Sequence, residues 1–228
     1  MTAIKELVCL ANSRKHGERC IAGIEVGSRD WIRPVTIHAG HAISASERRY
    51  LSGEEPQVLD VISMRLIDYQ PVGFQRENWL LDSSVRWEKT GQIGWGGLSR
   101  LEQRPVRLWL NGYSTNAGCN DFLPADRQST VNDSLKLIRV NGATIRVDTP
   151  SPRSEDARLV VRAEFKYAGS GYVLRVTDPV CEEKFRKQGV GRHRLGDSFL
   201  TISLSEEFMG RIFKLVAAVI EYGQIGRG

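Results

Sequence analysis

Short apolar or alternating segments, separated by turn-forming residues, recur along the whole chain and constrain its fold more than any other feature. Segments of this length, rich in Val, Ile, Leu and Tyr and bounded by Gly, Asn or Pro, are typical of β-strands. Clear examples are residues 6–10, 20–26, 58–69, 134–140, 158–167 and 172–176. The sequence therefore predicts a mainly β protein.

Local signals predict how some of these strands connect. The polar residues 12–19 separate two apolar runs and predict a hairpin loop. Asn141-Gly142 is a turn dipeptide and predicts a hairpin between residues 134–140 and 144–147. Asp178 followed by Pro179 predicts the start of a helix that ends at Gly189, because an aspartate caps free backbone donors and proline suits the first helical position.

The length of 228 residues allows one large β domain or two smaller ones. Residues 74–104 contain several Trp and Gly residues and predict an irregular excursion, and Pro105 precedes a new predicted strand at 106–110. We therefore expect one domain over residues 1–104 and another over 105–228. About five strands with an interposed helix, found twice, favour two OB-like small Greek-key β-barrels, with a continuous sandwich as the alternative.

Composition limits the partners and the compartment. The net charge of +5 and the pI of about 9.1 favour polyanionic partners. The N-terminus has no apolar signal core and no long apolar run follows it, so we expect a cytoplasmic protein without a membrane partner. The four cysteines lack the close spacing of a zinc or redox site.

Several motifs resemble those of a bacterial family described as dual-OB-containing. They are Cys9-Leu10-Ala11-Asn12-Ser13-Arg14-Lys15, Arg19-Cys20-Ile21-Ala22-Gly23, Trp31-Ile32-Arg33-Pro34, Asp133-Ser134-Leu135, Val176-Thr177-Asp178-Pro179, Leu195-Gly196-Asp197, Ile202-Ser203-Leu204 and Lys214-Leu215-Val216. The motifs extend over nearly the whole chain. The resemblance implies two OB-like barrels and carries no established activity. Binding of single-stranded nucleic acid follows from it only by analogy of fold.

The first candidate binding site lies around the predicted hairpin loop. Strand-connecting loops of OB folds contact oligonucleotides, and cations there can hold phosphates. Trp31 adds a ring for base stacking. The candidate residues are Arg14, Lys15, Arg19, Trp31 and Arg33. The alternative is a solvated, charged hairpin tip.

A second basic patch flanks Gly189 and Gly191, near the predicted end of the helix. It comprises Lys184, Arg186, Lys187, Arg192 and Arg194. Such a patch would bind phosphates with strong salt dependence. Cations are also favoured at a helix C-terminus without any ligand, so a structural role is the competing interpretation.

Enzyme signatures are weak. Glu164-Phe165-Lys166 has the Glu-x-Lys spacing of one nuclease class, with Asp148 or Asp156 as a further acid, and Asp178, Asp197 and Glu206 are other carboxylates at strand or turn ends. No nucleophile elbow, P-loop or dinucleotide motif is present, and no cofactor or metal site is predicted.

The sequence thus favours a non-catalytic protein that binds single-stranded nucleic acid or a nucleotide-like ligand. Two alternatives stay open. One is a metal-dependent nuclease, and the other is a protein-binding accessory subunit of a larger complex.

Overall fold

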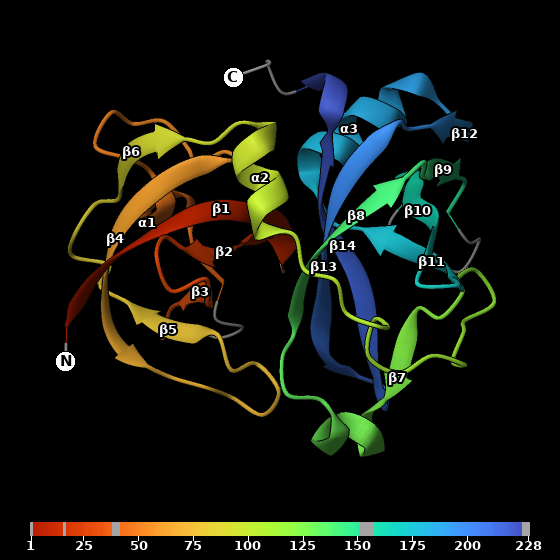
Figure 1. The fold of residues 1–228 in the computed structure, drawn as a ribbon, viewed down its shortest axis with the longest axis horizontal. Helices are drawn as coiled ribbons and strands as arrows, with labels where there is room; N and C mark the ends of the chain where they lie inside the picture. Colours follow the sequence, from red (N-terminus) through yellow and green to blue (C-terminus); the bar gives the residue numbers. More distant parts are fainter. Residues whose placement is uncertain (1, 16, 38–41, 151–156, 225–228) are drawn as a thin grey trace. The chain divides into compact units, whose positions relative to one another are not determined.

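The computed structural model describes residues 2–15, 17–37, 42–150 and 157–224. The chain divides into two compact units (Figure 1). Unit 1 comprises Met1–Glu102 and the returning segment Ser129–Leu135, and unit 2 comprises Gln103–Gln128 and Lys136–Gln224. The chain passes into unit 2 after Glu102 and returns to unit 1 over Ser129–Leu135, a return that the sequence did not indicate.

Unit 1 contains a closed barrel of five strands. They are β1 (Ala3–Lys15), β2 (Glu18–Glu25), β3 (Trp31–Val35), β4 (Asp60–Tyr69) and β5 (Asn78–Leu81). The order is β1-β2-β3-β5-β4, and pairing of β1 with β4 closes it. All neighbours are antiparallel except β3 and β5, which are parallel. This Greek-key barrel confirms the predicted OB-like fold.

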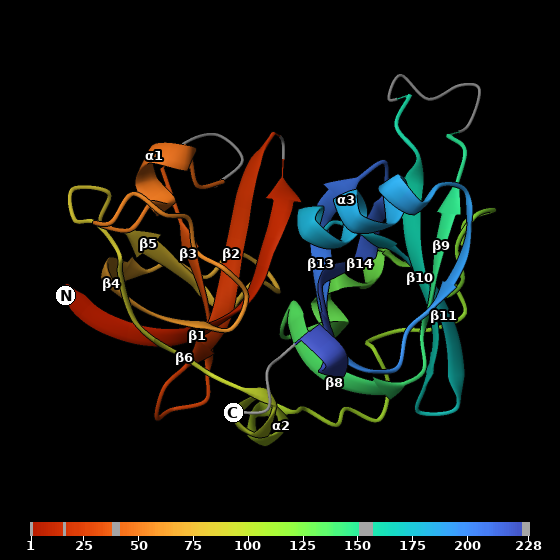
Figure 2. The same ribbon diagram turned by 90° about the horizontal axis from the view of Figure 1, so that it is seen from above.

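A single bent strand makes the closure possible. The start of β1 pairs with β4, and its later residues pair with β2, with a register shift between Cys9 and Ala11. Figure 2 shows β1 and β2 as a long hairpin. Gly23 lies opposite Cys9 in this hairpin. A Cβ atom at position 23 would lie 2.1 Å from the Val8 carbonyl oxygen, so only glycine fits.

The core of unit 1 collects the inward-facing residues of all five barrel strands. The short helix α1 (Ala45–Arg48) lies between β3 and β4 and begins with a capping box of Ser44 and Glu47. The predicted excursion at 74–104 instead contains β5, the added strand β6 (Glu88–Gln92) and helix α2 (Trp95–Leu101). Trp87, at the end of the loop between β5 and β6, is fully buried in the core of the barrel.

Unit 2 is built around a second sheet. Its strands are β7 (Phe122–Pro124), β8 (Leu135–Asn141), β9 (Thr144–Asp148), β10 (Val160–Tyr167), β11 (Ser170–Val176), β12 (Gly191–Arg194), β13 (Asp197–Phe208) and β14 (Arg211–Glu221). The path runs β12-β9-β10-β11-β14-β13-β8, and β7 pairs with β14. Two short 3-10 helices, η1 (Ala125–Thr130) and η2 (Tyr222–Gln224), complete the elements.

The predicted hairpin at Asn141-Gly142 is wrong. β9 pairs with β10, and β8 lies at the far end of the strand path, beyond β13. Gly142 has a φ of 88°, and because β8 and β9 are not neighbours in the sheet, the dipeptide bends the segment without folding it back on itself. β8 and β9 therefore act together as the bent first strand of an OB-like unit, as β1 does in unit 1. β11 and β14 are parallel, like β3 and β5.

Helix α3 (Pro179–Gln188) confirms the predicted start and end. The Asp178 carboxylate accepts hydrogen bonds from the Val180 and Cys181 backbone N–H groups, and Gly189 follows the last turn with a φ of 85°. The second oxygen of Asp178 accepts from the Val219 backbone N–H of β14 at 3.0 Å. Asp178 thus fastens the helix to the sheet.

The predicted strand at 106–110 is wrong, because this segment forms bends and no ladder. Lys214 of β14 holds it instead, since its ammonium donates to the Leu110 carbonyl at 2.5 Å and to the Asn111 side-chain oxygen at 3.1 Å. Burial lowers the pKa of Lys214 to about 8, against the opposing effect of Asp121 and Cys119. Hydrogen bonds from the buried Lys214 side chain therefore hold this segment in place of strand pairing.

We expect Gly23→Ala to destabilise the protein by about 1–3 kcal/mol, because the methyl group would overlap the Val8 carbonyl. Urea unfolding measures the change. Gly171→Ala is the matched control on another strand, since no heavy atom lies within 4 Å of a Cβ there. Equal stability of the two variants would contradict the close approach of β1 and β2.

Candidate functional site

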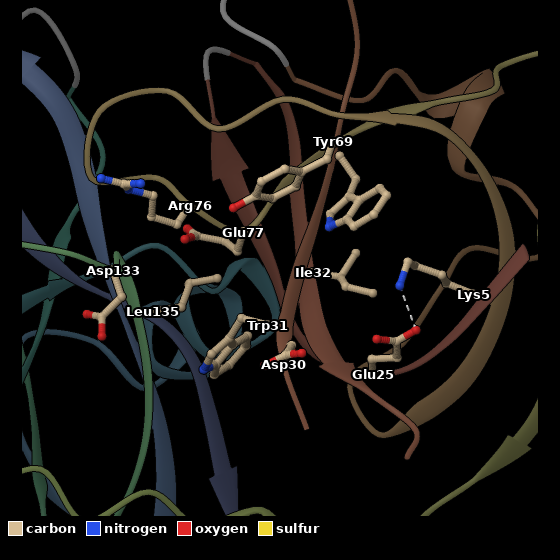
Figure 3. A pocket seen from close by; sticks show the side chains of 11 residues that line it. Lys5, Glu25, Asp30, Trp31, Ile32, Tyr69, Arg76, Glu77, Asp133 and Leu135 are labelled. Atoms are coloured by element: carbon tan, nitrogen blue, oxygen red, sulfur yellow. Dashed lines mark hydrogen bonds and ion pairs between the residues drawn. The ribbon is translucent and has the colours of Figure 1, made fainter. Parts of the chain in front are cut away.

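A pocket of about 480 Å³ opens at one end of the unit 1 barrel (Figure 3). The starts of β1, β3 and β5 and the ends of β2 and β4 meet at this end. The residues lining this barrel-mouth pocket are Lys5, Glu25, Asp30, Trp31, Ile32, Tyr69, Arg76, Glu77, Trp79, Asp133 and Leu135. Mouths of β-barrels are common positions for ligand sites.

Aromatic rings and an ion pair form one wall of the pocket. The rings of Tyr69 and Trp79 lie 5.2 Å apart at an angle of 51°. The Lys5 ammonium lies 4.6 Å from the Trp79 ring centroid and 2.8 Å from the Glu25 carboxylate. Burial acts to raise the pKa of Glu25, but hydrogen bonds from Lys5 and Ser28, with the charge of Lys5, outweigh it and lower the pKa. Lys5 and Glu25 thus form an ion pair in which each charge compensates the other.

Arg33 is a buried structural residue. On β3, Ile32 points into the barrel core, so Arg33 projects from the opposite face of the strand. Its guanidinium lies 2.9 Å from the Glu77 carboxylate and donates to the Ser134 hydroxyl at 2.8 Å, and Ser134 donates to Glu77. Arg33 is only 4% exposed. Arg33 is therefore not exposed to a ligand as the sequence predicted, and it connects β3 to the returning segment Ser129–Leu135.

The other candidate residues of the first site lie at two separate positions of unit 1. Arg14 lies opposite Arg19 near the tip of the β1–β2 hairpin, next to Lys15. Trp31 lies opposite Ile24, and Ile24 is five positions along β2 from Arg19, a distance of about 17 Å. The structure therefore separates Trp31, which lines the pocket, from these three hairpin cations.

Most of the second basic patch is paired with acids. The pairs are Lys184 with Glu221 (2.6 Å), Arg186 with Glu182 (2.5 Å), Lys187 with Glu183 (2.7 Å) and Arg192 with Glu164 (2.7 Å). Arg194 is exposed on β12. The patch consequently carries less uncompensated positive charge than its sequence indicates.

The structure instead reveals a row of arginines across four strands of unit 2. Arg192 of β12 lies opposite Arg146 of β9, which lies opposite Arg162 of β10, which lies opposite Arg175 of β11. Residues directly opposite each other point to the same face of a sheet. Their neighbours Ile145, Val161 and Leu174 are buried, so this arginine row lies on the outer face. Three strand spacings of about 4.8 Å make it roughly 14 Å long.

The arginine row has fewer acids than cations. Asp148 lies 2.9 Å from Arg146 and 3.2 Å from Arg162, and Glu164 pairs with Arg192. Arg175 is exposed and has no ion pair among the residues that the structure describes. Burial first lowers the pKa of Arg162, and the charges of Arg146 and Arg175 lower it further, against the opposing effect of Asp148. Like charges directly opposite each other on neighbouring strands destabilise a sheet. The row therefore lowers the stability of unit 2 unless an anion binds to it.

Four of the carboxylates proposed for a nuclease, Asp148, Asp178, Asp197 and Glu164, make structural contacts. Asp178 caps α3, Asp197 pairs with Arg139, and Glu164 pairs with Arg192. Asp148 binds two arginines of the row, and Asp156 lies outside the described residues. Within the described ranges, no group of three or more His, Cys, Asp or Glu residues could hold a metal ion.

The arrangement of both units agrees with a comparison against protein families. The model of a family described as "Dual OB-containing domain" matches residues 5–219. The chain belongs to this dual OB-containing domain family. The match spans both units of the dual-OB protein. Searches of curated proteins and of solved structures gave no match.

The arginine row and the barrel-mouth pocket of the dual-OB protein lie at positions that OB folds use for ligands. OB barrels use the face of their second and third strands and the loops after the first and fourth strands. β10 and β11 are the second and third strands of unit 2 and carry Arg162 and Arg175. In unit 1, the loop after the fourth strand β4 supplies Arg76 and Glu77 to the barrel-mouth pocket.

No helix in the described part of the dual-OB protein combines the length and apolarity needed to cross a membrane.

We expect Arg33→Met to cost about 3–5 kcal/mol of unfolding free energy, because it leaves the Glu77 carboxylate buried without its partner. The double variant Arg33→Met with Glu77→Leu removes both charges and is expected to recover most of that loss. Urea unfolding of both variants checks this. A double variant as unstable as the single one would contradict a buried ion pair.

Proposed function

We propose that the dual-OB protein binds single-stranded nucleic acid without catalysis of its own. The arginine row on the β10–β11 face of unit 2 is the observation that carries this proposal. Nucleic acid supplies closely spaced phosphates, and their charge would offset the repulsion among the arginines. The planar guanidinium also binds phosphate through two parallel hydrogen bonds.

The length of the row favours nucleic acid over small anions as its ligand. A single small anion would meet one or two guanidinium groups, whereas a strand of phosphates can follow a row roughly 14 Å long. Its outer members Arg175 and Arg192 are the exposed ones, and Arg192 has 56% of its side chain exposed. We therefore expect these two to make the first phosphate contacts.

The hairpin cations Arg14, Lys15 and Arg19 are proposed as a second contact. They flank the turn after the first strand of unit 1, one of the loops that OB barrels use for oligonucleotides. The charge at this tip is not all positive, because Lys15 lies opposite Glu18. We accordingly assign the hairpin a smaller share of the affinity than the arginine row.

Arg175→Ala is expected to weaken binding of a labelled single-stranded oligonucleotide by about 5- to 10-fold at low salt, or on the order of 1 kcal/mol. The slope of log affinity against log salt should fall by about 1, because one phosphate contact is lost. Stability should stay equal or rise by a few tenths of a kcal/mol, since a like-charge neighbour is removed. Fluorescence anisotropy and urea unfolding measure the two effects.

Arg49→Ala is the control for this variant, because Arg49 is also exposed but belongs to unit 1, whereas the row belongs to unit 2. It should leave both affinity and slope unchanged. Equal affinities of the two variants, or binding that does not respond to salt, would refute the role of the row.

For the hairpin, we expect Arg14→Ala with Lys15→Ala to weaken oligonucleotide binding by less than Arg192→Ala with Arg194→Ala does. The reason is that the second pair removes charge at the arginine row and its edge. Anisotropy at one low salt concentration compares the two, after circular dichroism has shown that both fold. The opposite ranking would make the hairpin the main site.

A further inference from the structure

The barrel-mouth pocket of unit 1 differs in chemistry from the arginine row. Its volume of about 480 Å³ suits a small ligand or one unit of a larger one. Four of its lining residues are acids (Glu25, Asp30, Glu77 and Asp133), against two cations, Lys5 and Arg76. A pocket with this balance disfavours several phosphates. It therefore fits a ligand that carries no more than one phosphate.

Two charged groups of the pocket are available to such a ligand. Lys5 and Glu25 pair with each other, Glu77 is held by Arg33 and Ser134, and Asp133 has an interaction of its own. The Asp30 carboxylate and the Arg76 guanidinium are both exposed, and the described residues provide neither with a side-chain partner. Figure 3 shows Asp30 beside Trp31 on one side of the pocket, and Arg76 with Glu77 and Tyr69 on the other. The pocket thus offers one acceptor and one cation at separate positions.

Aromatic side chains lie beside both of these groups (Figure 3). Trp31 is half-buried and lines the pocket, and Tyr69 and Trp79 form their tilted pair at its wall. Flat rings of this kind stack on nucleobases without regard to sequence, so stacking alone selects no base. Selection must come from the polar groups at the edge of the base.

We propose that the pocket binds one nucleotide whose base is adenine or cytosine, because these bases carry an amino group (N6 or N4) where guanine, uracil and thymine carry a carbonyl oxygen. The base lies against the aromatic side chains and donates its amino group to the Asp30 carboxylate, as acidic residues accept from the amino group of cytosine in DNA. Arg76 binds the 5′-phosphate. Uracil and thymine present a carbonyl oxygen in place of the amino group, and a carboxylate repels it.

This proposal rests on the proposed nucleic-acid binding for its class of ligand, but its test does not use the arginine row. The full-length protein is titrated with AMP, CMP and UMP, and binding is followed by tryptophan fluorescence and calorimetry. AMP and CMP are expected to bind about 5- to 10-fold more tightly than UMP. Tryptophan emission should change on binding, because Trp31 and Trp79 line the pocket.

Variants separate the two contacts. Asp30→Asn should remove the preference, weakening AMP and CMP while leaving UMP equal or tighter, because an amide can also donate to a carbonyl. Arg76→Ala should weaken all three nucleotides by a similar factor and leave adenosine unaffected. Glu88→Gln and Arg49→Ala, both at exposed positions outside the pocket, are the matched controls and should change nothing.

Each outcome decides between the proposals. Equal affinity for AMP, CMP and UMP overturns amino-group recognition. Failure of every nucleotide to bind, while oligonucleotides still bind with salt dependence, overturns the pocket and leaves the proposed function standing. Binding of AMP without any binding of oligonucleotides supports the pocket and refutes the proposed function.

Discussion

The close approach of β1 and β2 at Gly23 is the constraint on which the unit 1 barrel depends. One strand must pair with β4 over its first half and with β2 over its second, so it has to bend sharply between Cys9 and Ala11. The bend brings the Val8 carbonyl to the place where any other residue at position 23 would put its Cβ atom. Closure of the barrel in turn creates the mouth that holds the pocket. In unit 2 the bend falls at Gly142, whose positive φ serves the same purpose.

Electrostatics differ between the two units because burial differs. Arg33 and Glu77 are almost wholly buried, so each needs the other, and the pair ties Ser129–Leu135 to the barrel. The arginine row lies on an outer face where water and salt weaken the repulsion, so it can persist with only partial compensation by Asp148 and Glu164. A buried arginine of unit 1 is thus structural, and an exposed arginine of unit 2 is available for a ligand.

Local patterns predicted the elements whose stability is local. α3 was predictable from Asp178, Pro179 and Gly189, because capping and helix termination depend on neighbouring residues. The strands β2 and β4 followed from their composition. The hairpin predicted at Asn141-Gly142 was wrong because a turn dipeptide and a strand bend need the same backbone conformation. The strand predicted at 106–110 was wrong because alternating apolar residues form a strand only where another strand can pair with them.

The sequence by itself determined the mainly β class, the family and the positions of most strands and of α3, since these depend on residues near one another in the chain. Only the tertiary structure decided which side chains meet. The register of β9, β10, β11 and β12 aligns arginines that are far apart in the sequence, and a shift of one residue would turn each to the other face of the sheet. The same holds for Arg33, whose burial depends on Ser134, 101 positions away along the chain.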